Sequence, residues 1–99
     1  MLNINKTIEN GKAVFALGGR LDTTTAPELE KALRESLSGV SELTLDFAGL
    51  EYISSAGLRV LLAAQKAMKN QGKMKIKNVN ETIMEIFEVT GFSDILTIE

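Results

Sequence analysis

The stretch LTLDFAGLEYISSAGLRVLL, residues 43–62, decides the fold because two different periodicities meet in it. Apolar and polar residues alternate through residues 42–47, which predicts a strand with one buried face. After a turn expected at Gly49, apolar residues recur at helical spacing, which predicts a helix that begins near Ser55. These apolar residues are Leu58, Leu61, Leu62 and Met68. A strand that leads into a helix in this way is typical of an α/β fold.

Towards the N-terminus, the pattern predicts a β-hairpin. Leu2, Ile4 and Ile8 suit a strand with one solvent-facing side, and AVFAL at 13–17 suits a more buried strand. Asn10-Gly11 between them favours the positive backbone angles of a type I′ turn. The two strands are therefore expected to be antiparallel neighbours, and Gly18-Gly19 is expected to end the second one.

A helix is expected after this hairpin. Thr25 can cap it, Pro27 falls in the first turn, where its missing N–H loses nothing, and Glu28 completes a capping box. Gly39 is a suitable stop signal at the C-terminal end. The apolar side of this helix is expected to consist of Leu29, Ala32, Leu33 and Leu37.

The C-terminal part predicts one more strand and one more helix. Residues 70–72 end the helix before them, and the apolar pattern of 74–76 indicates a short strand. Asn80 can cap a last helix that Gly91 closes. Its core side is expected to consist of Ile83, Ile86 and Phe87.

The order of these elements indicates a single α/β domain over residues 1–99. A hairpin followed by alternating helices and strands gives a mixed central sheet of about four to five strands, packed with about three to four helices. The number of strands depends on Leu96 and Ile98, which either add an edge strand or only pack on the sheet.

The composition excludes several classes of function. A net charge of -2 over 99 residues, with interspersed signs, lacks the basic face that a nucleic-acid partner requires. The absence of cysteine and histidine removes thiol chemistry and the commonest general base and metal ligand. No apolar run approaches the roughly 20 residues that span a bilayer, and the chain does not begin like a signal peptide. We therefore expect a soluble, cytoplasmic protein with no cofactor and no nucleic-acid or membrane partner.

The most unusual segment is residues 52–58, where two hydroxyl groups and a glycine stand at the start of a helix. A helix N-terminus presents unpaired N–H groups and a partial positive charge, which suits an anion such as a phosphate. A phosphoryl group on Ser55 would add about -1.5 to -2 charges there. Gly57 removes a side chain nearby, so that the backbone of a partner could approach. Serine is also a favoured N-cap, so Ser54 or Ser55 could serve only to start the helix, and both interpretations stay open.

Catalytic roles for these serines find little support. A serine nucleophile needs a base, and the nearest downstream lysine, Lys66, lies about 16 Å further along the helix. The segment is not a phosphate-binding P-loop, and the glycine pair does not match the dinucleotide fingerprint. Asp22, Asp46 and Glu51 could form a carboxylate metal site, but their spacing matches no calcium loop. We therefore predict no catalytic residue and no metal site.

A second polar segment, Asp22-Thr23-Thr24, lies directly before the first helix. Loops that follow neighbouring parallel strands lie at the same end of a sheet, so Asp22 could lie near Ser55. Arg59 is one helical turn after Ser55 and could face a phosphate or simply be solvated. The lysines between Lys66 and Lys77 are interpreted as a solvated surface. They would permit weak contact with anionic lipid, but no amphipathic insertion pattern accompanies them.

Four segments together resemble the STAS domain of bacterial anti-sigma factor antagonists over nearly the full length of the chain. They are Leu17-Gly18-Gly19-Arg20-Leu21-Asp22, Leu43-Thr44-Leu45-Asp46-Phe47, Tyr52 to Leu61, and Phe87-Glu88-Val89-Thr90-Gly91-Phe92. The resemblance implies a mixed sheet flanked by helices and a partner switch without catalysis by the chain itself. In that family the unphosphorylated antagonist binds an anti-sigma factor that is also a serine kinase, which frees the sigma factor.

The resemblance also implies a site and a set of partners. Phosphorylation would fall on Ser55 and end the complex, and a metal-dependent serine phosphatase of the PP2C type would reset the switch. Ser54 stands where family members often have Asp, which bears on the rate of phosphorylation and on Ser54 as a second acceptor. STAS domains also resemble accessory subunits of transporters, and a soluble accessory subunit or another partner-switching output is the alternative function. The implied partner-binding residues are Asp22, Thr23, Thr24, Ser54, Ala56, Gly57, Leu58 and Arg59.

Overall fold

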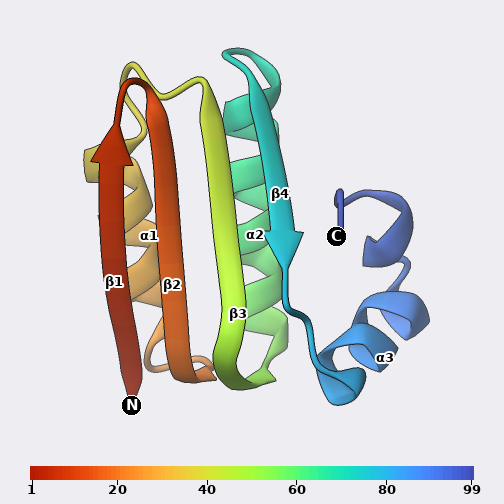
Figure 1. Cartoon of the computed structure of the whole chain (residues 1–99). Coiled ribbons are helices and arrows are strands. Elements are labelled where there is room, and N and C mark those ends of the chain that lie inside the picture. The colour runs from red at the N-terminus through yellow and green to blue at the C-terminus, as the bar shows by residue number, and fades with distance from the viewer.

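Four strands form one mixed sheet in the order β1-β2-β3-β4 (Figure 1). Strand β1 is antiparallel to β2, whereas β2, β3 and β4 are parallel to one another. The computed structural model describes residues 1–99. The elements are β1 (Leu2–Glu9), β2 (Lys12–Leu21), α1 (Ala26–Ser36), β3 (Glu42–Ile53), α2 (Ser55–Lys69), β4 (Lys73–Lys77), α3 (Glu81–Thr90) and the 3-10 helix η1 (Phe92–Asp94). The predicted α/β class with a mixed sheet and helices is confirmed.

The N-terminal hairpin forms as its turn residues predict. Asn10 and Gly11 both have positive φ angles, 51° and 78°, as a type I′ turn requires. The register places Glu9 opposite Lys12 and Leu2 opposite Gly19, so the two strands pair along their whole length. The hairpin therefore supplies the antiparallel edge of the sheet.

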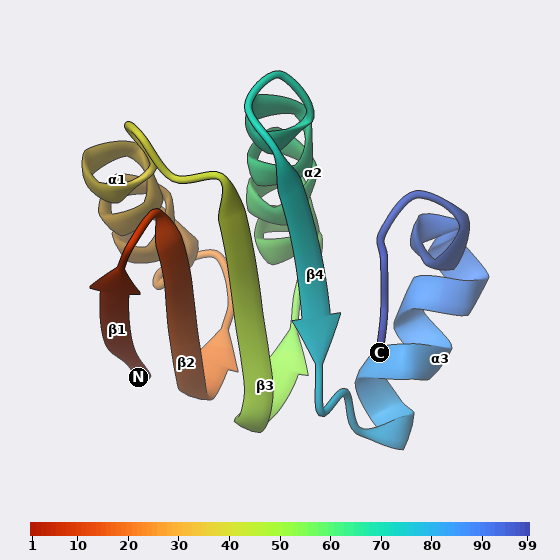
Figure 2. The same cartoon turned by 45° about the horizontal axis from the view of Figure 1, so that its top comes forward.

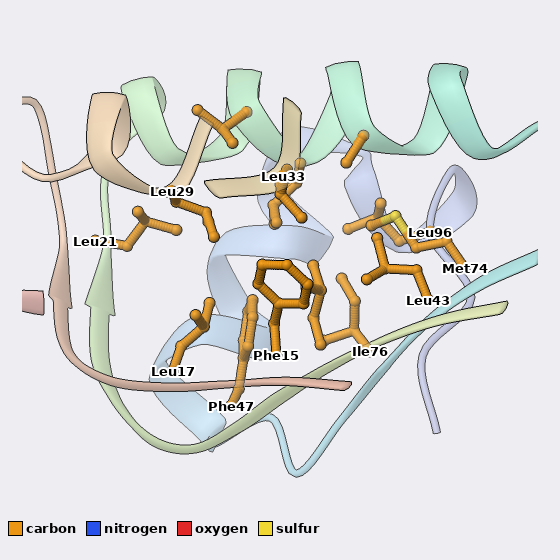
Figure 3. Close-up of a cluster of buried hydrophobic side chains, with 14 of the residues drawn as sticks. Phe15, Leu17, Leu21, Leu29, Leu33, Leu43, Phe47, Met74, Ile76 and Leu96 are labelled. Atoms are coloured by element: carbon orange, nitrogen blue, oxygen red, sulfur yellow. The ribbon is translucent and has the colours of Figure 1, made fainter. Parts of the chain in front are cut away.

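The core lies between the sheet and a layer of helices on one of its faces. Helices α1 and α2 cover that face, and α3 lies beyond the edge formed by β4 (Figures 1 and 2). Alternate residues of the central strands point into this layer, and Phe15 and Phe47 are fully buried there (Figure 3). Leu29 and Leu33 of α1 meet them from the helix side, and Phe87 of α3 stands 6.4 Å from Phe47 between ring centroids. Most of the predicted apolar residues of the helices are therefore buried, and Ala32, Leu62 and Ile86 are partly buried.

Strand β3 is longer than the sequence pattern predicts. It continues to Ile53, so the turn expected at Gly49 is wrong, and β2 likewise continues past Gly18-Gly19 to Leu21. At two places β3 has one more residue than the paired segment of β2, which is the signature of a β-bulge. The bulges interrupt the alternation of buried and exposed residues, so the sequence pattern does not reveal the full length of the strands. Gly49 allows the two strands to approach closely here, because a Cβ at this position would lie only 3.2 Å from the Leu17 carbonyl oxygen.

The C-terminal part follows its predicted signals. The Asn80 side chain accepts a hydrogen bond from the Ile83 N–H at 2.8 Å, and Gly91 ends α3 with a φ of 83°. The last residues do not form a fifth strand; Ile98 makes a single parallel bridge to Ile76, and Leu96 is buried in the core. None of the helices has the length and apolar character that would let it cross a membrane.

Candidate functional site

The two serines at the start of α2 have different environments. Ser54 is the N-cap, is partly buried, and its side-chain oxygen accepts a hydrogen bond from the Gly57 N–H at 3.4 Å. Ser55 is the first residue of the helix and is exposed, and its hydroxyl makes no hydrogen bond within the chain. The two interpretations left open by the sequence are thus divided between neighbouring residues, since Ser54 caps the helix and Ser55 offers a free hydroxyl.

The electrostatic environment of Ser55 favours a negative group. The first turn of α2 contains no acidic residue, so the partial positive charge of the helix N-terminus is not offset within the helix. Arg59, one turn later, is exposed and forms no ion pair. A phosphate on the Ser55 hydroxyl would therefore meet favourable local charges.

Gly57 is buried, and it allows α2 to pack closely on the ends of the strands. A Cβ at this position would lie 2.7 Å from Cγ1 of Ile53 and 2.8 Å from Cγ of Leu21. The prediction that Gly57 leaves space for a partner backbone is wrong, because these two core side chains already fill the space. Leu58 is buried as well, so Gly57 and Leu58 form the packed side of the first turn of α2 and fix its position on the sheet.

The loop before α1 is held by the Asp22 carboxylate. Its Oδ1 accepts hydrogen bonds from the Thr24 hydroxyl at 2.8 Å, the Thr24 N–H at 3.0 Å and the Thr25 N–H at 3.1 Å. The hydrogen bond from the Thr24 hydroxyl, with those from the two backbone N–H groups and the Thr25 hydroxyl, lowers the pKa of Asp22 below its usual 3.8. The Asp22 side chain therefore fixes the loop, while Thr23 and Thr24 remain exposed on it.

Thr25 does not cap α1 as predicted. It is buried, its hydroxyl donates to the Arg20 carbonyl at 2.8 Å, and the hydroxyl oxygen accepts from the Asp22 N–H at 2.8 Å. The start of α1 has no side-chain cap, so the expected capping box with Glu28 is absent. The Thr25 hydroxyl instead satisfies two backbone groups of the preceding segment, the Arg20 carbonyl and the Asp22 N–H.

The Asp22 loop and the start of α2 lie side by side, as the sequence predicts. Leu21 pairs with Ile53 across the sheet, and the Ser54 N–H donates to the Leu21 carbonyl oxygen at 2.9 Å. Among the predicted partner-binding residues, Thr23, Thr24 and Arg59 are exposed, as is the predicted phosphorylation site Ser55. The partly buried members of the predicted set are Asp22, Ser54 and Ala56. This end of the sheet therefore presents two adjacent backbone segments with exposed hydroxyl groups.

Two further residues of this end were not predicted from the sequence. The Arg20 guanidinium lies 4.5 Å above the centroid of the Tyr52 ring, and its Nε lies 3.8 Å from Oδ2 of Asp22. Arg20 pairs with Tyr52 only because the second bulge inserts Glu51 into β3. No sequence signal reveals this pair, since a regular register would place a different residue opposite Arg20.

The three carboxylates weighed as a metal site in the sequence do not come together in the structure. Asp46 accepts hydrogen bonds from the Asn78 side chain at 2.9 Å and the Ala48 N–H at 3.0 Å, which lower the pKa of Asp46. Asp22, Asp46 and Glu51 form no group that could hold a metal ion. Within the lysine cluster, Lys75 pairs with the terminal residue Glu99 at 3.2 Å.

The surface around Ser55 is not a small-molecule pocket. A hollow of about 480 Å³ lies at the other end of the sheet, where β3 and β4 begin. Its lining includes Glu42 and Lys73 and neither of the two serines. Small ligands prefer enclosed, largely apolar clefts, whereas an exposed surface of loops and a helix start suits a protein partner.

Comparison with known proteins identifies relatives of the whole chain. The model of the STAS domain family matches residues 3–99. A Staphylococcus aureus protein named anti-sigma-B factor antagonist is 31% identical over 97 residues, which cover 96% of this chain and 90% of that protein. A Bordetella bronchiseptica protein, BtrV, named as a candidate anti-sigma factor antagonist, is 33% identical over 91 residues, with coverage of 90% and 78% respectively.

Solved structures confirm the likeness of the fold. An anti-sigma factor antagonist from Mycobacterium paratuberculosis superimposes with a TM-score of 0.89 at 20% identity, covering 99% of this chain and 85% of the other. The Bacillus cell fate determinant SpoIIAA in its phosphorylated form superimposes with a TM-score of 0.75 at 16% identity, covering 100% and 91%. At these identities the structures support the arrangement of strands and helices described above.

Proposed function

The chain belongs to the STAS domain family, and on this premise we propose that it is an anti-sigma factor antagonist whose binding is switched by phosphorylation of Ser55. In its unphosphorylated form it would bind an anti-sigma factor that is also a serine kinase, and so release a sigma factor. Phosphorylation of Ser55 would end this complex, and a PP2C-type phosphatase would restore it. The names of the two relatives support the assignment to antagonists.

One observation carries the choice of Ser55, namely the division of roles between the two serines. The Ser55 hydroxyl is exposed and free of hydrogen bonds, whereas the Ser54 side chain is engaged in capping α2. A kinase could therefore approach the Ser55 Oγ without disturbing the helix. Ser54 performs the capping role for which aspartate is equally suited, so serine at this position is compatible with the switch.

The proposed chemistry takes place on this chain but is catalysed by its partners. The Ser55 Oγ would attack the γ-phosphorus of ATP in the kinase, forming an O–P bond as the bond to the β-phosphate oxygen breaks. ADP leaves, and the hydroxyl proton passes to a base of the kinase. The phosphatase would use water to return Ser55 and inorganic phosphate. The chain itself would act as a binding protein and not as an enzyme.

Phosphorylation would disrupt binding because of the charge that it adds. The phosphate introduces about -1.5 to -2 charges, which the free helix terminus tolerates in the isolated chain. In an interface, the same group loses its water and requires an opposite charge on the partner. The contacts disrupted would be those of Asp22, Thr23, Thr24, Ser54, Ala56 and Arg59, while Gly57 and Leu58 keep the helix in place.

The test uses the anti-sigma factor kinase encoded in the same genome, with ATP and magnesium. Mass spectrometry of the incubated chain is expected to place one phosphate on Ser55. Ser54→Ala, as the matched control, should still be phosphorylated, and Ser55→Ala should not. Surface plasmon resonance should show binding of the kinase to the wild-type chain and loss of that binding for Ser55→Glu.

Two results would contradict the proposal. The first is a phosphate on Ser54, or on a serine elsewhere, in the wild-type chain. The second is unchanged affinity of the kinase for Ser55→Glu, provided that circular dichroism shows this variant to be folded. A phosphate on Ser55 that a PP2C-type enzyme cannot remove would separate the kinase step from the resetting step.

A further inference from the structure

We propose that Arg20 and Tyr52, together with Arg59, form a cationic docking surface beside Ser55 that receives an acidic patch of the partner. The inference rests on the proposed function and defines the chemistry of the partner at the same site. It begins with Arg20, whose guanidinium is stacked on the Tyr52 ring with 4.5 Å between Cζ and the ring centroid. The Arg20 side chain is 54% exposed in spite of this contact.

The second bulge of β3 creates the pair. Gly19 pairs with Leu50 and Arg20 pairs with Tyr52, so that Glu51 is the extra residue. Without the bulge, Glu51 would stand opposite Arg20 and would neutralise it. Gly19 is part of this arrangement, since its φ is 93° and a Cβ there would lie 2.1 Å from the Met1 carbonyl oxygen. The bulge thus places the Tyr52 ring, and not the Glu51 side chain, opposite Arg20 on the neighbouring strand, and the Asp22 carboxylate is the acidic group that pairs with the guanidinium.

The Arg20 guanidinium is held in position without being saturated. One face rests on the ring, and Nε lies 3.8 Å from Oδ2 of Asp22, but none of its N–H groups donates a hydrogen bond within the chain. The other carboxylate oxygen of Asp22, Oδ1, accepts the hydrogen bonds from Thr24 and Thr25 within its own loop. A positioned guanidinium with free donors is suited to bind a carboxylate in a bidentate manner.

This pair lies within the same interface as the switch serine. The Ser54 N–H donates to the carbonyl oxygen of Leu21, the residue after Arg20. Tyr52 and Ser55 are three residues apart, so their Cα atoms are separated by at most about 11 Å. Arg59, which forms no ion pair, adds a second exposed cation one helical turn beyond Ser55, whereas Arg20 is paired with Asp22. An interface of ordinary size covers all of these residues.

The charge of this surface explains why a phosphate would act as a switch. An acidic patch of the partner would be attracted by Arg20 and Arg59 while Ser55 is unmodified. After phosphorylation, the same patch would face about -1.5 to -2 additional charges, and the phosphate would compete for the arginines. Phosphorylation of Ser55 would therefore turn the attraction between this surface and the acidic patch of the partner into repulsion.

The experiment measures binding of the anti-sigma factor kinase from the same genome to variants of the full chain. Arg20→Glu is expected to lower the affinity roughly ten- to hundredfold, mainly through slower association and with a weaker dependence on salt. The affinity of Arg20→Lys should lie between those of the wild type and Arg20→Glu, because lysine keeps the positive charge but not the stacked guanidinium. Tyr52→Phe should bind like the wild type, and Tyr52→Ala should bind more weakly.

Arg34→Glu is the matched control, because Arg34 is an exposed arginine in the last turn of α1 and pairs there with Glu30. It should bind like the wild type. Equal affinity of folded Arg20→Glu and wild type would overturn the inference and leave the proposed function intact, as would tighter binding of Arg20→Glu. If the kinase neither binds the wild-type chain nor phosphorylates Ser55, the proposed function is overturned, and the acidic partner with it.

Discussion

The starts of α2 and α3 are built on the same plan but differ in charge. In both, an N-cap side chain accepts a hydrogen bond from the N–H three residues later, at 3.4 Å from Gly57 to Ser54 and at 2.8 Å from Ile83 to Asn80. Helix α3 then has Glu81 in its first turn, whereas α2 has no acidic residue there. The start of α3 therefore has both a cap and an acidic residue, whereas the start of α2 has a cap but no acidic residue. Ser55 occupies the position in α2 where phosphorylation would add the missing negative charge.

The third residue of each helix provides the largest expected effect. Ile83 is fully buried, whereas Gly57 stands where any Cβ would meet Ile53 and Leu21. Ile83→Ala should therefore lower the free energy of unfolding by about 2–5 kcal/mol through the cavity it leaves. Gly57→Ala should lower it by about 1–3 kcal/mol through overpacking. Urea denaturation followed by circular dichroism measures both.

Gly18→Ala provides the control for Gly57→Ala. A Cβ at Gly18 would meet its nearest neighbour, the Gly49 carbonyl oxygen, at 3.7 Å, which is an ordinary contact. Its stability should stay within about 0.5 kcal/mol of the wild type. A Gly57→Ala variant as stable as Gly18→Ala would show that α2 can move away from the strand ends without penalty.

Removing each N-cap should have a smaller and unequal effect. The Asn80 side chain also donates to the Leu50 carbonyl oxygen at 3.0 Å, and its capping bond is the shorter of the two. Asn80→Ala should therefore destabilise the chain by about 1–2 kcal/mol and Ser54→Ala by about 0.5–1 kcal/mol. Thermal unfolding of the two variants measures the difference.

Ser54→Asp tests the cap of α2 with a substitution that should keep the capping hydrogen bond. An aspartate can cap α2 and also adds the negative charge that its first turn lacks, so this variant should be at least as stable as the wild type. Lower stability of Ser54→Asp than of Ser54→Ala would show that the Ser54 side chain does not act as a cap.

The helix starts also show what could be predicted from the sequence. The Asn80 cap and the end of α3 at Gly91 depend on neighbouring residues, and both were predicted correctly. Thr25 was misassigned because the Arg20 carbonyl near the end of β2 and the Asp22 N–H compete for its hydroxyl. Competition between a loop and a helix for one side chain is decided by tertiary geometry, which a local pattern does not contain.

The same reasoning applies to the candidate site. The proximity of the Asp22 loop to the start of α2 was predicted from the expected order of strands, whereas the choice of Ser55 as the phosphorylation site came from the family resemblance. The division of roles between Ser54 and Ser55 could not be predicted, because either serine can cap a helix. The pairing of Arg20 with Tyr52 depends on an extra residue in β3, and a bulge shifts register without leaving a periodic signal.

Supplying the missing charge of α2 should have a modest stabilising effect. Ser55→Glu should raise the free energy of unfolding by about 0.3–1 kcal/mol relative to Ser55→Gln, which has the same shape and no charge. Glu81→Gln should lower the stability of α3 by a similar amount. Both differences should shrink in high salt. Lower stability of Ser55→Glu than of Ser55→Gln would contradict the view that α2 lacks a negative charge at its start.

The smallest expected effect is a response to pH at the start of α1, where a carboxylate holds the preceding loop. The hydrogen bond from the Thr24 hydroxyl is the main cause of the lowered pKa of Asp22, which is 3.8 when unperturbed. Because the pKa is lower in the folded chain, the contribution of Asp22 to stability is complete above about pH 4 and is lost as the pH falls through the lowered value. The amide signals of Thr24 and Thr25 in NMR spectra should therefore shift on acidification, whereas that of Ile83 should not, since the Asn80 amide that caps α3 does not titrate. Asp22→Asn should abolish the response. If the Thr24 and Thr25 signals of the wild type stay constant down to about pH 2, the Asp22 carboxylate does not hold this loop.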